Sequence, residues 1–265
     1  MAFAPATTVQ GPVRLPLPYG LFSVVSLAEA VTERWENGVN WQALTCDPVA
    51  IVVGDCDDPT GFPMEFPEEC PPWGEADAFT VYGTARFTPI AGDLAEGQRL
   101  AREVLLAREQ AAVEAQVWSL LQAGTPTVVT GGTAARALGD LEKWIGDVYG
   151  SLGVIHASRN AATTLVDARL IKASSGGMYT ELGTPVVVGA GYDGSDEGGD
   201  PPSSGTEFIA ASPAMFGYRS QVIEDSNRPG DLMDRTTNDL YGIAERNYLI
   251  GIDPCGTAFA SLTLG

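Results

Sequence analysis

A single long helix constrains the fold of this chain more than any other feature, and we predict it over residues 93–122. Asp93 suits the N-cap, and Glu96 stands at the capping-box position three residues later. Gly124 and Pro126 end the helix. At 1.5 Å per residue it measures roughly 43 Å. Because this length exceeds that of an ordinary core element, the other elements have to be arranged along the helix.

The helix has a narrow apolar stripe and a broad charged face. The side chains that we expect to be buried recur at helical spacing: Leu100, Val104, Ala107, Ala111, Trp118 and Leu121. The charged side chains that we expect on the opposite, solvated face are Arg99, Arg102, Glu103, Arg108, Glu109 and Glu114. So polar a face indicates a surface spine rather than a core helix.

A β-hairpin is predicted just before the helix, over residues 79–90. Its two short strands span residues 79–82 and 85–87, and Pro89 and Gly92 end the hairpin. The sequence predicts no element that would cover it. A protruding hairpin beside a long helix is typical of a subunit that reaches its neighbours, and it is unusual in an enzyme.

Two proline-containing stretches precede the hairpin. Residues 1–20 are rich in Pro, Ala and Thr, and their prolines favour an extended arm over a helix. Residues 46–73 are rich in Pro, Asp and Gly. Within them we expect a strand at residues 49–53 and an irregular, extended stretch at 62–73. Loops of this length inside a domain are usually functional.

The remainder of the chain mixes strands and helices. Strands are expected at residues 127–132, 154–156, 185–188, 207–211, 216–222, 241–252 and 257–264, the last as an edge or a central strand. A helix beginning near Thr133 has a buried face of Ala134, Leu138, Leu141, Ile145 and Val148. Another is capped by Ser158 and runs to about Ile171, with Leu165 and Val166 inside. Because strands and helices do not alternate strictly, the fold class is α+β.

The charge and hydropathy of the chain exclude several functions. It carries 34 acidic and 15 basic residues, a net charge of -19, which argues against non-specific nucleic-acid binding. No apolar run approaches the roughly 20 residues that a membrane span needs. The N-terminus lacks the basic start and apolar core of a signal peptide, so we expect a cytoplasmic product.

The four cysteines are Cys46, Cys56, Cys70 and Cys255, and none forms a Cys-x-x-Cys pair. The favoured interpretation is buried thiols in a reducing compartment. A disulfide within the region 46–70 is the alternative. A zinc site is the least favoured, because the spacing is wrong and the chain has a single histidine.

Three patterns resemble chemical sites, but each has a better structural explanation. Residues 189–194, Gly-Ala-Gly-Tyr-Asp-Gly, match a dinucleotide fingerprint, yet an acidic, proline-containing loop follows in place of the required helix. The acidic clusters lack the calcium-loop order and are expected to be solvated, flexible loops: Asp193, Asp196, Glu197 and Asp200, and Asp55, Asp57 and Asp58. His156, the only histidine, is expected to be structural. We therefore expect no catalytic site, cofactor or metal.

Three local sequences and the order of the elements resemble a known family. The sequences are GVIHAS at 153–158, MYTELGTPVVV at 178–188 and ERNYLI at 245–250. The order is an extended arm, a long loop, one spine helix, a mixed body and a returning C-terminal strand. Together they resemble the major capsid proteins of tailed double-stranded DNA phages, the Hong Kong 97 type fold, and are similar to those of actinobacteriophages.

The resemblance implies a division of the chain into regions. Residues 1–45 would be the N-terminal arm and lead-in, and 46–92 the extended loop that lies over a neighbouring subunit. Residues 93–126 would form the peripheral domain with its spine helix, and 127–240 the axial domain. Residues 241–265 would return to the peripheral domain.

The resemblance also implies partners and a location. The chain would assemble with itself, as hexamers and pentamers, into an icosahedral shell that encloses DNA without binding it specifically and without a membrane. It implies a separate scaffold protein or none, leaves a decoration protein open, and places the product in the virion after assembly in the host cytoplasm. Because residues 46–92 contain no lysine, the covalent Lys–Asn bond of some members is not expected; Lys143 and Lys172 are the only lysines.

Candidate contacts between subunits lie on the predicted hairpin and spine. They are Arg86, Arg99, Arg102, Arg108, Phe79, Tyr82 and Phe87. The alternative for the helix arginines is pairing with glutamates one turn away on the same helix. Three rival functions remain: an encapsulin-like shell around cargo enzymes, a tail-tube or connector protein, and an acidic hydrolase that uses His156.

Overall fold

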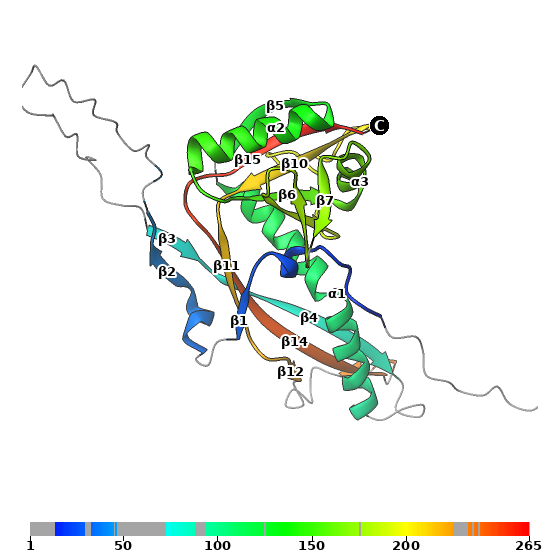
Figure 1. Ribbon diagram of the computed structural model, residues 1–265. Coiled ribbons are helices and arrows are strands. Elements are labelled where there is room, and N and C mark those ends of the chain that lie inside the picture. Colours follow the sequence, from blue (N-terminus) through cyan, green and yellow to red (C-terminus); the bar gives the residue numbers. More distant parts are fainter. Residues whose placement is uncertain are drawn as a thin grey trace, which may run out of the picture.

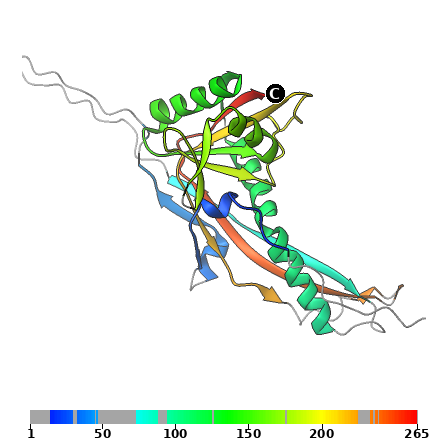
Figure 2. The same cartoon turned by 45° about the vertical axis from the view of Figure 1, so that its right-hand side comes forward.

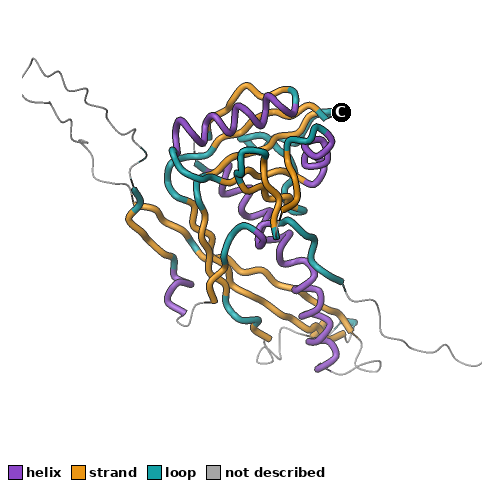
Figure 3. The backbone as a smooth tube through the Cα atoms, in the orientation of Figure 1, coloured by secondary structure: helices purple, strands orange, loops and turns teal. Residues whose placement is uncertain are grey.

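The two large β-sheets of the described chain lie at the two ends of one long helix, α1 (Leu94–Ala123) (Figure 1). The structure is a computed structural model. It describes residues 14–29, 33–44, 46, 73–87, 94–124, 126–174, 176–224, 233–234, 236–237 and 239–264. Figure 3 shows the strands gathered in two groups, one at each end of α1. No helix of the described part is long and apolar enough to cross a membrane.

The first sheet has seven described strands. In spatial order they are β5 (Thr127–Gly132), β15 (Ala258–Thr263), β10 (Thr206–Ser212), β6 (Val154–Ser158), β9 (Pro185–Gly189), β8 (Gly177–Thr180) and β7 (Ile171–Ser174). Two pairs, β5 with β15 and β6 with β9, are parallel, and the other pairs are antiparallel. The strand predicted at 257–264 is therefore central, since β15 lies between β5 and β10.

Helices cover both faces of the seven-stranded sheet. Successive strand residues point to opposite faces, so Ile155 packs in the cluster with α2 (Ala134–Trp144) and α3 (Arg159–Asp167), whereas Val154 packs in the cluster with α1. A π-helical turn, Ile145–Tyr149, continues α2. Both faces of the sheet are thus buried, which explains the continuous apolar character of its central strands.

The N-cap predicted at Ser158 and the helix start predicted near Thr133 are confirmed, whereas Asp93, the N-cap predicted for α1, lies outside the described residues. The predicted buried faces are confirmed in part. The side chains of Thr133 and Ser158 accept hydrogen bonds from backbone N–H groups inside α2 and α3, respectively. Val148 and Val166, predicted to be buried, are exposed. The helix predicted to reach Ile171 ends at Asp167, because Ile171 already belongs to β7.

The second sheet has six described strands around the long strand β14. They are β1 (Leu27–Glu29), β4 (Ala78–Phe87), β11 (Met215–Arg219), β12 (Ile223–Glu224), β13 (Met233–Asp234) and β14 (Asp239–Ile252). All ten residues of β4 pair antiparallel with β14. In Figure 2 these two strands run beside each other along the lower part of α1. The 3₁₀ turn η2 (Glu33–Asn37) packs on this sheet, whereas η1 (Leu21–Ser23) contacts α1 and β9 of the seven-stranded sheet.

The hairpin predicted at residues 79–90 is wrong, because residues 78–87 form one uninterrupted strand. Gly83 falls between the two strands predicted for the hairpin, but it allows a close approach between strand and helix. A Cβ atom at Gly83 would lie 2.6 Å from the carbonyl oxygen of Ala101 and 2.7 Å from the amide nitrogen of Leu105. Glycine therefore lets α1 pack directly onto the backbone of β4.

A two-stranded hairpin does occur earlier in the chain. Strand β2 (Val39–Gln42) pairs antiparallel with β3 (Trp73–Ala76), and we call this pair the stem. The stem lies at one side of the body (Figure 1). The segment 43–72 connects its two strands. The strand predicted at 49–53 lies outside the described residues, as do Asp55, Asp57 and Asp58.

The bounds of α1 agree with the prediction to within one residue at each end, but its buried face differs. Trp118 and Leu121 are buried as expected. The other four predicted core residues, Leu100, Val104, Ala107 and Ala111, are only half-buried or exposed. The observed buried row repeats every four residues: Gly97, Ala101, Leu105, Glu109, Val113, Val117 and Leu121. Small residues dominate its first half because the sheet below approaches so closely.

Replacing Gly83 with alanine should destabilise the protein by about 1–3 kcal/mol, because the new methyl group has to displace the backbone of α1. Gly139, inside α2, is the matched control, since its Cβ would meet no atom within 4 Å. Gly139→Ala should stabilise the helix by about 0.5–1 kcal/mol. Urea denaturation of both purified variants measures the difference. Equal stability of the two would contradict the close packing described here.

Candidate assembly site

Glu114 of α1 is fully buried and binds two other parts of the chain. One carboxylate oxygen accepts a hydrogen bond from the N–H of Leu21 at 3.0 Å. The other accepts from the N–H groups of Ala190 at 2.7 Å and Gly191 at 3.0 Å. Leu21 begins η1, and Ala190 follows β9. Burial raises the pKa of Glu114 above its ordinary value, although the hydrogen bonds act in the opposite direction.

Glu109 makes the corresponding connection to the six-stranded sheet. Its two carboxylate oxygens accept hydrogen bonds from Nη1 of Arg246 at 2.9 and 3.0 Å, and the hydroxyl of Tyr248 donates to it at 2.8 Å. Both partners belong to β14. The side chains of Glu109 and Arg246 are only 9% and 12% exposed. Burial and the Glu109 charge raise the pKa of Tyr248, so its hydroxyl keeps its proton.

The prediction that Glu109 and Glu114 lie on a solvated face is therefore wrong. The signal that could have identified Glu109 is its place in the four-residue row between Leu105 and Val113, where it is the only charged member. Glu114 adjoins that row, but its partners are backbone N–H groups, which no side-chain pattern reveals. The two carboxylates bind α1 to one sheet each.

The acidic loop after β9 is bound to the C-terminal half of α1 at its base. The indole N–H of Trp118 donates to the hydroxyl oxygen of Ser195 at 2.9 Å, and that hydroxyl donates to Asp193 at 2.6 Å. The side-chain amide of Gln122 donates to the carbonyl of Asp196 at 2.6 Å. No helix follows Gly194, as predicted. Our expectation of a wholly solvated loop is wrong at its base, since Ser195 is 2% exposed.

His156 is fully buried and has a structural environment, as predicted. Its Nδ1 lies 2.9 Å from the hydroxyl of Tyr192, and its Nε2 lies 2.9 Å from the hydroxyl of Ser212. Because Ser212 donates its proton to the carbonyl of Pro213, Nε2 carries the imidazole hydrogen and Nδ1 accepts from Tyr192. Burial lowers the pKa of His156 to about 3, so the ring is neutral.

The predicted contact arginines form pairs within the chain, with one exception. Arg86 donates to Asp239, with Nε at 2.8 Å, and Arg102 pairs with Glu224 at 3.0 Å. Arg99 pairs with the glutamates at 96 and 103 on its own helix, which is the alternative stated above. In the described part of the chain, Arg108 has no hydrogen-bond or ion-pair partner.

These arginines do not gather at one place. Arg86 lies on β4, whereas the others lie on α1. At 100° per residue, Arg108 lies on the opposite side of α1 from Arg99. The side chains of Arg86, Arg99 and Arg102 are 58%, 45% and 54% exposed, so each can contact another molecule while it keeps its present partner.

The three predicted contact aromatics divide between two faces of β4. Phe79 stacks on Tyr248 with ring centroids 6.1 Å apart, and Phe87 covers Gly97 of α1. Both are half-buried against the body. Tyr82 is 69% exposed and shares the solvent-facing side of β4 with Arg86. Of the predicted contact residues on β4, only Tyr82 and Arg86 thus lie on its solvent-facing side.

The described cysteines contradict the favoured interpretation of free thiols. Cys46 and Cys255 form a disulfide, with Cα atoms 5.8 Å apart and 209 residues of separation. Cys46 therefore pairs neither within the region 46–70 nor in a zinc site. Cys56 and Cys70 lie outside the described residues. No group of three or more His, Cys, Asp or Glu side chains in the described part is placed to hold a metal ion.

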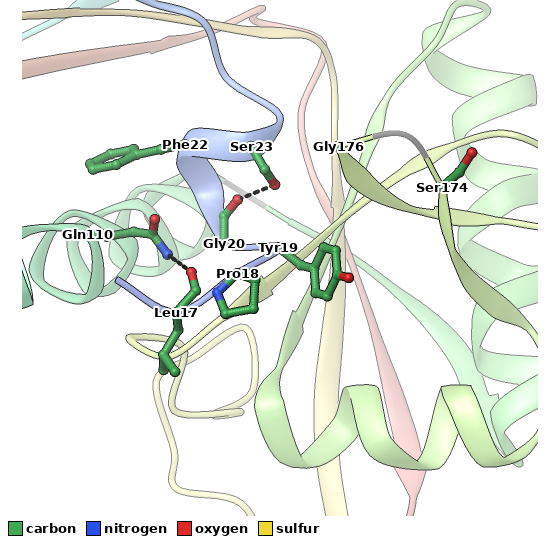
Figure 4. Close-up of a pocket in the computed structure, with 9 residues that line it drawn as sticks. All are labelled: Leu17, Pro18, Tyr19, Gly20, Phe22, Ser23, Gln110, Ser174 and Gly176. Carbon is green, nitrogen blue, oxygen red and sulfur yellow. Dashed lines mark hydrogen bonds between the residues drawn. The ribbon is translucent and has the colours of Figure 1, made fainter. Parts of the chain in front are cut away.

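A shallow cavity of about 420 Å³ lies between the N-terminal segment, residues 14–23, and the β7–β8 hairpin (Figure 4). The side-chain amide of Gln110 donates to the carbonyl of Leu17 at 3.2 Å across one side of it. No acidic or basic side chain belongs to its described lining. The cavity therefore offers shape and backbone groups, and no charged group for acid–base chemistry.

Comparison with known proteins gives structural matches alone. No model of a protein family matches the sequence, and no curated protein matches it. A chain from Mycobacterium phage Che8 has a TM-score of 0.51 and 14% identity, over 98% of this chain and 97% of that one. This likeness shows that the two chains share a fold along nearly their whole length.

Two further solved structures match less closely. One is the holo-SrpI encapsulin complex from Synechococcus elongatus PCC 7942, with a TM-score of 0.49 and 13% identity, over 98% of this chain and 92% of that one. The other is the capsid of an empty GTA particle, with a TM-score of 0.47 and 12% identity, over 97% of this chain and 100% of that one.

Proposed function

We propose that this chain is the major capsid protein of a tailed double-stranded DNA phage, with the Hong Kong 97 type fold, and that it assembles with itself into an icosahedral shell. The observation that carries the proposal is its architecture. One helix spans two sheets, and a stem and an N-terminal segment lie at the sides of the body. The fold shared with the Che8 chain and the sequence resemblance support it. The product would reside in the virion after assembly in the host cytoplasm.

The segment between the stem strands has a charge that suits a contact with another copy. Residues 43–72 contain no basic residue, and their acidic residues are Asp47, Asp55, Asp57, Asp58, Glu65, Glu68 and Glu69. Arg86, Arg99 and Arg102 are exposed on the body. We propose that this acidic segment of one subunit lies against those arginines, and against Tyr82, on a neighbour. The grip would be non-covalent, because no lysine lies between residues 46 and 92.

We also propose revised regions for the chain. The six-stranded sheet with most of α1 would be the peripheral domain, and it includes β4, which the first division assigned to the extended loop. The seven-stranded sheet would be the axial domain, and it includes the C-terminal strand β15. The stem and residues 43–72 would form the extended loop. Hexamers and pentamers of the body, with or without scaffold and decoration proteins, would build the shell.

Electron microscopy of the purified full-length chain tests the proposal. Closed shells that contain DNA when taken from virions are the expected result, and after boiling in detergent the shells should run as a single band near 27.8 kDa. Shells filled with a cargo protein would identify an encapsulin instead. Rings or tubes would identify a tail or connector protein, and a ladder of boiled multimers would contradict the non-covalent grip.

The geometry of His156 does not support the hydrolase that would use it. His156, the only histidine, is fully buried and both of its nitrogens are hydrogen-bonded, so it cannot contact a substrate. We propose that the chain has a structural role alone.

A further inference from the structure

The Cys46–Cys255 disulfide joins the chain just beyond the stem to the connection between the two large sheets. Cys46 follows the end of β2 at Gln42, where the chain leaves the stem. Cys255 lies in the connection from β14 to β15, where the chain passes from the six-stranded sheet to the seven-stranded one. The bond therefore fixes the exit of the stem to the connection between the two sheets.

Other contacts hold a different part of the same region. Trp41 of β2 packs edge-on against Phe216 of β11, with centroids 4.9 Å apart. Trp35 of η2 stacks on Tyr218 at 6.0 Å. These rings bind η2 and β2 to the six-stranded sheet. Beyond Gln42, Ala43 is buried, and the disulfide is the covalent bond that joins the chain to the body at Cys46.

We propose that Cys46 and Cys255 form a redox-dependent lock: the pair is reduced while the subunit folds in a cytoplasm, and it is oxidised once the protein meets an oxidising environment. Disulfides rarely persist among cytosolic proteins because small thiols reduce them. Both cysteines are half-buried rather than enclosed, so a small oxidant can reach them. The bond itself does not depend on the proposed shell. Its oxidation after the shell leaves the host cytoplasm rests on the proposed function.

The chemistry requires a small-molecule disulfide such as oxidised glutathione. One cysteine loses its proton, and its thiolate attacks a glutathione sulfur, which forms a mixed disulfide and releases one glutathione thiolate. The second cysteine thiolate then attacks the protein sulfur of that mixed disulfide and releases the second glutathione. Two protein thiols thus lose two electrons and two protons, and one oxidised glutathione becomes two reduced molecules.

The closed bond should stabilise the folded chain substantially, because it links residues 209 apart in sequence and so restricts the unfolded state. Locking should raise the unfolding temperature by roughly 5–15 °C. It should also fix the chain at Cys46 to the connection between the two sheets, whereas the reduced form leaves this point attached through the stem and the buried Ala43.

The test uses the full-length chain, oxidised with glutathione disulfide, or reduced, and then alkylated with N-ethylmaleimide. We expect mass spectrometry of the oxidised sample to find the peptides of Cys46 and Cys255 joined. Cys46→Ser and Cys255→Ser should each lose the 5–15 °C gain and become insensitive to reductant, and Cys70→Ser is the control that should keep both.

Three results would overturn the lock. They are alkylated thiols at both positions after oxidation, a Cys46 peptide joined to Cys56 or Cys70, and a wild-type unfolding temperature that reductant does not change. Failure of the chain to form shells while the joined peptide is present would refute the proposed function and leave the lock intact.

Discussion

Glu114→Ala is expected to lower the free energy of unfolding by roughly 3–5 kcal/mol, because it leaves three backbone N–H groups, one of them fully buried, without their acceptor. These are the groups of Leu21, Ala190 and Gly191. The N-terminal segment and the loop after β9 should both detach from α1. Urea denaturation measures the loss, and hydrogen exchange at the three amides should rise together.

Two variants make this expectation specific. Glu103→Ala removes a carboxylate that is 57% exposed on the same helix, and it should leave stability nearly unchanged. Glu114→Gln keeps one oxygen acceptor but turns an amide NH₂ toward a backbone donor. Its loss of stability should therefore lie between those of Glu103→Ala and Glu114→Ala. A Glu114→Ala protein as stable as Glu103→Ala would contradict the role of Glu114 described here.

The pH dependence of this site has a defined sign. Burial raises the pKa of Glu114 above its ordinary value of 4.5, so the folded chain holds the proton more tightly than the unfolded chain does. The contribution of Glu114 to stability is therefore greatest below pH 4.5 and decreases as the pH rises through the raised pKa. The loss caused by Glu114→Ala should be larger in acid than at neutral pH.

Glu109→Ala should be comparably damaging, with a loss of roughly 3–5 kcal/mol, because the guanidinium of Arg246 would keep its charge inside the protein without a carboxylate. The hydroxyl of Tyr248 would lose its acceptor as well. The double variant Glu109→Leu with Arg246→Met replaces the pair with apolar groups, and it should recover most of the loss. If the double variant is as unstable as Glu109→Ala, packing rather than the buried charge accounts for the effect.

The sequence predicted those features that depend on local patterns. The helix α1, the caps Thr133 and Ser158, and most strands were predictable because propensity and spacing act within a few residues. The structural role of His156 followed from its apolar neighbours. The α+β class followed from the order of the elements.

The features that were missed depend on distant contacts. The hairpin was predicted across Gly83 because glycine in a strand has the same local signature whether it turns the chain or admits a helix. Glu114 was placed in solvent because acidic residues are rarely fully buried. The backbone N–H groups that donate to its carboxylate lie 76, 77 and 93 residues away in the sequence. The Cys46–Cys255 bond spans 209 residues, so no spacing rule points to it.

The two buried glutamates leave the body without a hinge. Glu109 joins α1 to β14 of the one sheet, and Glu114 joins it to the loop that follows β9 of the other. Bending between the sheets would break hydrogen bonds of a buried carboxylate at both places, so the body should move as one piece. If the chain assembles as proposed, any change of curvature would then arise at the contacts between neighbouring bodies rather than inside one body.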